Sequence, residues 1–256
     1  MFATMAQPGL VEASIPAEGV LVLAFNRPEK RNALSKELIK DFLAELHRAS
    51  VDDAIRVVII TGNGPFFCAG ADIKEIAAMD AEAARSCRYL EDLCHGMQAL
   101  RKPLLAAVNG HALGGGFEVA LMCDLIFASQ GTQFSFPEAN LGLIPGAGGT
   151  QRLTATLGKF RAMRTILLGR SISSDEALAA GLVCDVLPDN KLLEGAIEAA
   201  SAMAQRPPMA MQMAKEAIRR ADDLGRDDLF ERNLYYSAFG TSEMRSGTGR
   251  FLNKKV

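Results

Sequence analysis

The 256-residue chain has no excess of charge of either sign. It contains 28 lysine and arginine residues against 30 aspartate and glutamate residues, and its formal net charge is −2 at pH 7. It also lacks the Lys/Arg-rich runs that mark nucleic-acid-binding surfaces. We therefore expect no nucleic-acid partner.

Long apolar runs are also missing. The longest stretches without Asp, Glu, Lys or Arg are 57–71 and 103–117, of 15 residues each, and both contain glycine, asparagine and proline. Neither is suited to a transmembrane helix. The first basic residue is Arg27, so the start resembles neither a secretory signal nor an Arg-rich presequence. The sequence predicts a soluble, cytoplasmic protein with no membrane partner.

Patterns of metal ligands and disulfides are absent too. The five cysteines form no C-x-x-C pair, and the three histidines are scattered. An odd cysteine count without such pairs disfavours both a disulfide framework and a structural zinc site. We expect no bound metal.

The hydrophobic pattern predicts an α/β core followed by a helical C-terminal part. Short apolar, β-branched runs predict buried strands, and apolar residues at helical spacing predict helices. A helix predicted over 83–100 would bury Cys87 and Cys94. A capping box at 173–176 predicts the start of another helix, and from about Lys191 the composition is typical of helices. The predicted strands are Val20–Phe25, Arg56–Thr61, Leu104–Val108 and Asp124–Ala128, and the predicted helices cover 34–46 and 83–100.

The glycine-rich segments do not match the common nucleotide-binding or hydrolase motifs. No complete G-x-G-x-x-G, no P-loop and no G-x-S-x-G elbow occurs. What remains is a strand-to-helix turn at Leu113–Gly116. Its first amides point beyond the helix N-terminus, where they could bind an anion or stabilise an oxyanion. The alternative is a tight turn with close backbone packing.

Two glutamates are candidate acid–base groups. Glu118 lies in the apolar segment Phe117–Cys123, where a buried carboxylate needs a partner or a proton. The alternative is an exposed residue in the first turn of a helix. Glu138 ends the pattern Ser135-Phe-Pro-Glu138, which also fits a helix-capping box.

Other polar residues carry weaker signals. Asp72 and Lys74 follow a strand and a glycine-containing loop, a position where ligands of α/β sheets bind, although solvated surface charges are the usual alternative. His111 has no Ser, Cys or Asp pattern beside it and is interpreted as a turn residue.

Taken together, the motifs resemble the enoyl-CoA hydratase/isomerase (crotonase) superfamily over nearly the whole chain. They occur in the family's order along the sequence. The matching segments are Asn26–Leu34, Cys68–Lys74, Gly114–Glu118, Pro137-Glu138, Ile144–Leu153, Ala180–Val183 and Phe251–Lys254.

The resemblance implies a set of catalytic groups. Ala71 and Gly115 match the positions whose backbone N–H groups form the family's oxyanion hole. Glu118 and Glu138, 20 residues apart, match its two catalytic glutamates. Isomerases of the family typically retain only the second glutamate, so the presence of both favours an enoyl-CoA hydratase.

The resemblance also implies the substrate and its contacts. The substrate would be an acyl group carried as a coenzyme A thioester, with no prosthetic group. Coenzyme A contacts would involve Lys30, Ala69, Asp72–Lys74 and the tail residue Lys254.

For the fold, the resemblance implies a spiral of ββα turns. This α/β core with the active site would cover residues 1–195, and a helical oligomerisation region would cover 196–256. The family's usual assembly is a homotrimer or a dimer of trimers.

Several alternatives remain open from the sequence. Phe117 and Phe136 flank the two glutamates and are bulkier than is common in the family. They would either narrow the acyl pocket, raise a carboxyl pKa by desolvation, or simply fill the core. The function could be another crotonase-type reaction, such as double-bond isomerisation or hydration of an unusual acyl-CoA, or non-catalytic binding of acyl-CoA or RNA.

Overall fold

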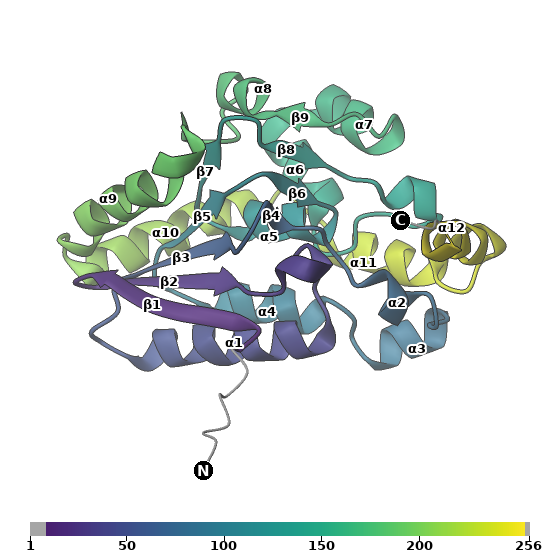
Figure 1. Cartoon of the computed structure of the whole chain (residues 1–256), viewed down its shortest axis with the longest axis horizontal. Coiled ribbons are helices and arrows are strands. Elements are labelled where there is room, and N and C mark those ends of the chain that lie inside the picture. Colours follow the sequence, from purple (N-terminus) through teal and green to yellow (C-terminus); the bar gives the residue numbers. More distant parts are fainter. Residues whose placement is uncertain (1–8, 254–256) are drawn as a thin grey trace, which may run out of the picture.

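The structure is a computed structural model that describes residues 9–253, in which the strands form two sheets (Figure 1). The larger sheet has six strands in the order β1-β2-β3-β5-β7-β10, and the smaller has four in the order β4-β6-β8-β9. Neighbouring strands are parallel except for the pairs β1–β2 and β8–β9. The strands are β1 (Val11–Ala17), β2 (Val20–Phe25), β3 (Val57–Gly62), β4 (Phe66–Cys68), β5 (Leu104–Val108), β6 (His111–Leu113), β7 (Leu125–Ser129), β8 (Gln133–Ser135), β9 (Ile172–Ser173) and β10 (Asp185–Leu187).

The chain alternates between the two sheets in a regular way. β3, β5 and β7 lie in the larger sheet, and each is followed directly by a strand of the smaller sheet: β4, β6 and β8. Helical segments then return the chain to the larger sheet. This repeat is the spiral of ββα turns that the family resemblance implied, so the predicted fold class is confirmed.

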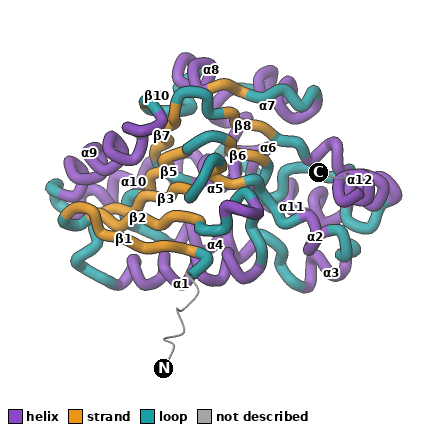
Figure 2. The backbone as a smooth tube through the Cα atoms, viewed as in Figure 1, coloured by secondary structure: helices purple, strands orange, loops and turns teal. Residues whose placement is uncertain are grey.

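Helices surround the sheets and make up the whole C-terminal part of the described chain (Figure 2). None of the helices within residues 9–253 has the length and apolarity needed to cross a bilayer. The helices are α1 (Lys36–Val51), α2 (Ile73–Ile76), α3 (Ala81–Ser86), α4 (Glu91–Ala99), α5 (Gly115–Met122), α6 (Gly149–Leu157), α7 (Lys159–Leu167), α8 (Ser174–Ala179), α9 (Leu192–Ala204), α10 (Pro208–Asp223), α11 (Asp228–Ala238) and α12 (Ser242–Asn253), with 3₁₀ turns η1 (Pro28–Lys30), η2 (Glu138–Leu141) and η3 (Asp189–Lys191).

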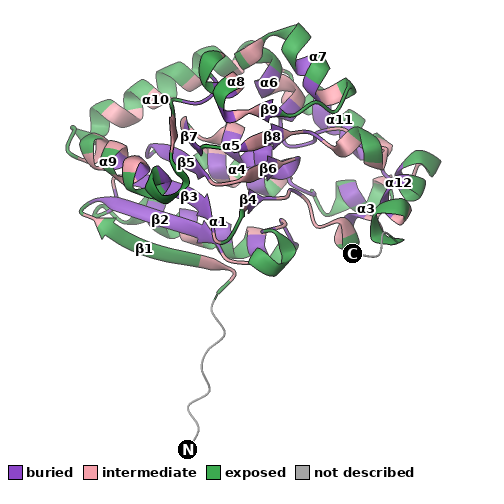
Figure 3. Cartoon of the chain, turned by 45° about the horizontal axis from the view of Figure 1, so that its top comes forward, coloured by how far each residue is buried: buried purple, intermediate pink, exposed green. Residues whose placement is uncertain are grey.

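The central strands are buried on both faces, which explains their uninterrupted apolar sequences. Alternate residues of β3 enter two different hydrophobic clusters: Val58 and Ile60 face one side, and Val57 and Ile59 face the other. The first cluster is closed by α1 and α4, and the second by α9. Figure 3 shows β2, β3 and β5 buried, whereas the outer strand β1 and the helices α7, α10 and α12 are largely exposed.

Most predicted elements are confirmed, and one is wrong. All four predicted strands occur within one residue of their predicted bounds, and Ser173 accepts a hydrogen bond from Glu176 N to cap α8, as its sequence indicated. The helix predicted over 83–100 is instead two helices, α3 and α4. Arg88 and Leu90, both with positive φ, separate them.

This break has consequences for the side chains around it. It turns Tyr89 and Leu90 into the core, where both are buried. It also leaves Cys87 exposed, so the predicted burial of Cys87 is wrong, while Cys94 is buried as predicted. The helix α9 runs through the predicted boundary between residues 195 and 196, and the division into two regions stays a prediction.

The two-sided burial of β3 can be tested with a matched pair of valines. Val58 is fully buried in β3, and Val51 at the end of α1 is 69% exposed. We expect Val58→Ala to lower the free energy of unfolding by about 2–3 kcal/mol and Val51→Ala to change it by less than about 0.5 kcal/mol. Urea denaturation of both variants measures the difference, and equal effects would contradict this description of the core.

Candidate active site

Three loops meet at one edge of the smaller sheet because their strands are parallel. Within this sheet β4 pairs with β6 and β6 pairs with β8, so the carboxyl ends of the three strands point the same way. The segments that follow them are 69–72, 114–118 and 136–138. Two of the loops are joined directly, since Gly114 N donates to Ser135 O over 2.9 Å. The three motif regions of the sequence therefore come together.

A small cavity of about 40 Å³ lies among these loops. Several residues singled out in the sequence line it, namely Ala69, Ala71, Ile73, Gly115, Glu118 and Glu138. The remaining lining is apolar side chains and backbone, apart from the side chain of Tyr235. These other residues are Gly70, Ile76, Leu90, Gly114, Pro137, Leu141, Leu143, Ile144, Gly146 and Tyr235.

The backbone amides of Ala71 and Gly115 adjoin each other on the cavity wall. Gly115 is the first residue of α5, and a Cβ atom built on it would lie 3.6 Å from Ala71 N. Within residues 9–253 neither N–H donates to a protein acceptor. Two unpaired donors that adjoin on the wall of one small cavity, one of them at the start of α5, can stabilise negative charge on an oxygen atom.

The glycine-rich turn also serves close packing. Gly114 has a φ of +51°, and a Cβ on it would lie 2.6 Å from Glu138 Oε1. A Cβ on Gly116 would lie 2.2 Å from Cys68 O. The tight-turn interpretation is therefore correct, and it is compatible with the free amides. The same close packing brings these amides to the cavity.

Glu118 is buried in the wall of the cavity, so the alternative of an exposed helix residue is wrong. It is 1% exposed, and its Oε1 accepts hydrogen bonds from Ala147 N (2.7 Å) and Gly149 N (2.8 Å). Burial, and next the charge of Glu231, raise its pKa to about 7, whereas the two amides act in the opposite direction. This carboxyl can therefore change its protonation state near neutral pH.

Glu138 begins η2 directly after β8 and faces the same cavity. Its Oε2 is buried and has no hydrogen-bond partner. Burial, and then the charge of Glu118, raise its pKa well above the ordinary range. The capping interpretation is wrong because the N-cap position of η2 is Pro137 and no side chain caps it. Glu138 is a buried carboxyl that favours the protonated form.

A third buried carboxyl, Glu231 of α11, was missed by the sequence analysis. It is 2% exposed and accepts hydrogen bonds from Gly148 N and Thr150 N. A signal was available, since Glu231, Arg232, Tyr235 and Tyr236 repeat at helical spacing and occupy the buried face of α11. A charged pair on the same face as two tyrosines indicates buried polar contacts rather than solvated charge.

Of the residues expected to contact coenzyme A, only Ala69 and Ile73 line the cavity within the described part of the chain. Lys30 and Lys74 are exposed and do not line the cavity. Asp72 already has structural contacts, because it caps α2 by accepting a hydrogen bond from Lys74 N and forms an ion pair with Arg27 at 3.0 Å. Lys254 lies outside the described residues. His111 begins the strand β6, so its interpretation as a turn residue is wrong; its ring packs against Phe66 at a centroid distance of 4.9 Å and does not line the cavity.

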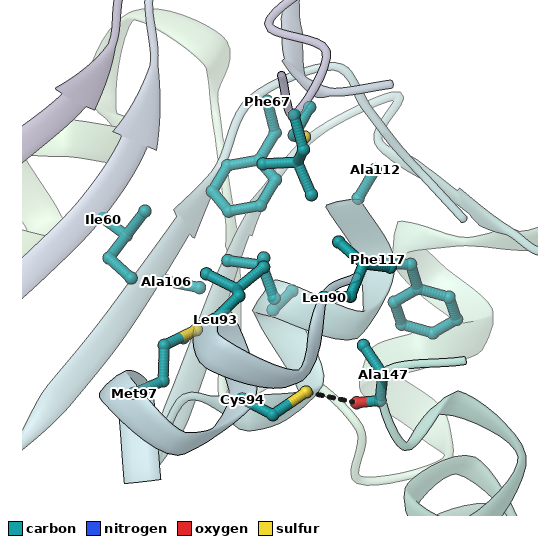
Figure 4. Packing of buried hydrophobic residues seen from close by; sticks show 14 of the residues in the cluster. Ile60, Phe67, Leu90, Leu93, Cys94, Met97, Ala106, Ala112, Phe117 and Ala147 are labelled. Atoms are coloured by element: carbon teal, nitrogen blue, oxygen red, sulfur yellow. Dashed lines mark hydrogen bonds between the residues drawn. The ribbon is translucent and has the colours of Figure 1, made fainter. Parts of the chain in front are cut away.

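Phe117 and Phe136 pack behind the site and do not line the cavity. Their rings stack at a centroid distance of 4.8 Å, and both are buried. Figure 4 shows Phe117 beside Ala147, the residue whose N–H holds Glu118. Of the three alternatives raised by the sequence, core packing therefore fits best, and this packing supports the backbone that binds Glu118.

Comparison with known proteins gives a consistent result. Residues 16–256 match the family model described as enoyl-CoA hydratase/isomerase. The chain is 43% identical to 2,3-dehydroadipyl-CoA hydratase of Escherichia coli, covering 93% of each protein. It is 40% identical to the mitochondrial enoyl-CoA hydratase of Pongo abelii, covering 91% of this chain and 81% of the relative. A crystal structure of enoyl-CoA hydratase from Bacillus anthracis superimposes with a TM-score of 0.79 at 36% identity, covering 96% of this chain and 97% of that one.

The burial of Glu118 predicts a pH-dependent loss of stability that Glu118→Gln removes. Since the folded-state pKa is raised, the unfolded chain ionises first, and wild-type stability falls as the pH rises from the ordinary value of 4.5 through about 7. We expect the stability of the variant relative to wild type to increase by about 2–3 kcal/mol between about pH 5 and about pH 8, measured by urea denaturation.

The matched control for this experiment is Glu216→Gln. Glu216 lies on α10 with a side chain 68% exposed. Its substitution should leave the pH dependence of stability unchanged. An identical pH dependence for Glu118→Gln and wild type would contradict the raised pKa of Glu118.

Proposed function

Because this chain belongs to the enoyl-CoA hydratase/isomerase family, we propose that it is an enoyl-CoA hydratase, a hydro-lyase that reversibly adds water to a 2-trans-enoyl-CoA to give 3-hydroxyacyl-CoA. The observation that carries this proposal is the presence of two buried carboxyls, Glu118 and Glu138, beside two free amides in one cavity. The substrate is carried as a coenzyme A thioester, and no prosthetic group takes part.

The amides of Ala71 and Gly115 act on the thioester oxygen. When water adds to the β-carbon, electron density moves through the α-carbon to this oxygen and gives an enolate-like species. Two preorganised N–H donors stabilise that charge in a site without bulk water. In other enzymes the loss of one such donor raises the barrier by about 2.7–4 kcal/mol, so this pair supplies a large part of the rate enhancement.

The two glutamates divide the proton transfers. Glu118, whose carboxylate is stabilised by two amides, ionises first and takes a proton from the attacking water, whose oxygen bonds to the β-carbon. Glu138, with a buried oxygen lacking any partner, holds its proton and delivers it to the α-carbon. Two carboxyls that share one buried site favour this asymmetry because both cannot ionise at low energetic cost.

The coenzyme A moiety and the assembly extend this proposal. We assign contacts with the phosphates of the nucleotide end to Lys30, Lys74 and Lys254, and contacts along the path to the cavity to Ala69 and Asp72–Ile73. We assign the chain to the cytoplasm and to a homotrimer or a dimer of trimers built through the helical region 196–256. The exposed apolar side chains of α10 and α11, such as Ile218 and Leu229, support such an assembly.

The acyl part of the cavity favours a neutral chain. Ile76, Leu90 and Leu141 are among the residues that line it, and no lysine, arginine or histidine between residues 9 and 253 does. Of the described residues, the ionisable carboxyls that line it are Glu118 and Glu138, and ionised Glu118 would repel a carboxylate at the end of the acyl chain. The second candidate function is hydration of 2,3-dehydroadipyl-CoA, which the 43% identity to the Escherichia coli protein favours.

Both glutamates should be required for hydration. We expect Glu118→Gln and Glu138→Gln each to lower kcat by about 100- to 10,000-fold, because each removes one proton transfer. Loss of the ultraviolet absorbance of the conjugated thioester of crotonyl-CoA measures the rate. Acyl-CoA binding, measured by calorimetry, should be retained.

The exposed Glu216→Gln variant again serves as the control and should keep the wild-type rate. Absence of hydration by the wild-type protein with crotonyl-CoA and with a medium-chain enoyl-CoA would contradict the proposed function. In that case a test for double-bond isomerisation follows.

The two candidate substrates can be separated by a matched pair of six-carbon thioesters. 2-Hexenoyl-CoA and 2,3-dehydroadipyl-CoA differ only in the terminal carboxylate. Because burying an unpaired carboxylate costs several kcal/mol of free energy, we expect kcat/KM to favour 2-hexenoyl-CoA by about 100-fold or more. A preference for 2,3-dehydroadipyl-CoA would establish the second candidate instead.

A further inference from the structure

The loop that holds Glu118 has a second carboxylate on its other amides. Ala147 N and Gly149 N donate to Glu118, whereas Gly148 N and Thr150 N donate to Glu231. Four successive amides therefore alternate between two buried carboxylates from α5 and α11. Thr150 Oγ1 adds a further hydrogen bond to Glu231 Oε2.

From this arrangement we propose that Glu231 is a positioning residue for the hydration reaction. By accepting the N–H groups of Gly148 and Thr150, it fixes the backbone of Ala147–Thr150 so that the other two amides bind Glu118. Glu231 does not line the cavity and acts only through this loop. The proposal rests on the role of Glu118 in the proposed function.

The loop has little freedom to adopt another geometry while Glu231 is in place. Gly148 has a φ of +95°, which lets consecutive amides point to opposite sides. The carboxylate spans two of these amides with bonds of 2.6 and 2.7 Å, the short lengths typical of charge-assisted hydrogen bonds. Without this acceptor, two buried N–H groups would lose their partner, and the loop would rearrange to satisfy them.

Other contacts seat α11 on the same loop. Tyr235 stands against Gly146, where a Cβ would lie 2.3 Å from the ring. The carbonyl of Ala147 accepts from Arg152 at 3.1 Å and from the Cys94 thiol at 3.7 Å, the contact drawn in Figure 4. These contacts fix where the loop lies. Glu231 differs from them in that it sets the direction of the amides.

Charge gives the proposal a readout that a purely structural residue would not move. The negative charge of Glu231 is the second-largest cause of the raised pKa of Glu118. Removing it should therefore lower that pKa, provided the amides of the loop stay in place. The ionisable and charged groups around the two carboxylates are Glu138 on η2, Cys94 on α4, Arg152 on α6, and Asp228, Arg232 and Tyr235 on α11.

The test is Glu231→Gln in the full-length protein with crotonyl-CoA as substrate. Gln has the size of Glu but no charge, and its NH₂ group cannot accept a backbone N–H. We expect kcat to fall by about 10- to 100-fold while KM stays within about threefold of wild type, since the variant disturbs the proton transfer and not substrate binding. Because Glu118 must be ionised, activity is lost as the pH falls below its pKa. We expect this acid limb of the kcat/KM profile not to move to lower pH, because losing the two amides that bind Glu118 opposes the loss of the Glu231 charge.

A second variant keeps the proposal testable if Glu231→Gln does not fold. Thr150→Val removes the hydroxyl that donates to Glu231 and accepts a longer hydrogen bond from Gln151 Nε2, and it leaves the backbone amide. We expect kcat to fall by about three- to tenfold with KM unchanged. Glu216→Gln is the matched control for both variants and should behave as wild type.

The outcomes separate this proposal from the proposed function. Wild-type hydration combined with an unchanged kcat in Glu231→Gln would overturn the positioning role, and an acid limb moved to lower pH with that unchanged kcat would assign Glu231 a purely electrostatic effect on Glu118. An unchanged kcat in Thr150→Val would also overturn the positioning role. Absence of hydration by wild type, in contrast, is a failure of the proposed function itself.

Discussion

The parallel pairing of β4, β6 and β8 is the constraint on which the rest of this site depends. Each strand has only three residues, yet each places its carboxyl end at the same edge of the smaller sheet. Ala71 and Glu138 are more than 65 residues apart along the chain, and Gly115 lies between them. The pairing of the three strands alone brings these residues to one cavity. The larger sheet, buried on both faces, supplies the rigid layer against which the short strands are held.

Electrostatics then decides how the buried carboxyls coexist. Three glutamates from α5, η2 and α11 lie close enough for the charge of one to affect the pKa of another. Glu118 and Glu231 are stabilised by backbone amides of one loop, whereas Glu138 has an oxygen without any partner. Desolvation thus raises the pKa of all three carboxyls, but hydrogen bonds from this loop oppose the rise only for Glu118 and Glu231. The physical result is a pair of cavity-lining carboxyls with different tendencies to hold a proton, which is what acid–base chemistry at neutral pH requires.

Some of the fold and site could be predicted from local sequence because the deciding interactions are local. Strands buried on both faces need uninterrupted apolar residues, so Val20–Phe25 and Leu104–Val108 could be located directly. The prediction of a single helix over 83–100 was wrong because hydrophobic periodicity cannot detect a residue such as Leu90, which adopts a positive φ and is buried in the core. The capping pattern at Ser135–Glu138 failed for a related reason, since Ser135 belongs to a strand and pairs with β6.

The sequence by itself determined the α/β class, the order of the motif segments and the presence of Glu118 and Glu138. These features follow from the type of each residue and its position along the chain, without any tertiary contact. Only the tertiary structure decided that Glu118 and Oε2 of Glu138 are buried, that the amides of Ala71 and Gly115 adjoin, and that Glu231 from the C-terminal helices joins the loop holding Glu118. These facts depend on contacts across 29 to 83 residues of chain. Such contacts are set by packing, and packing leaves no local pattern from which a partner can be identified.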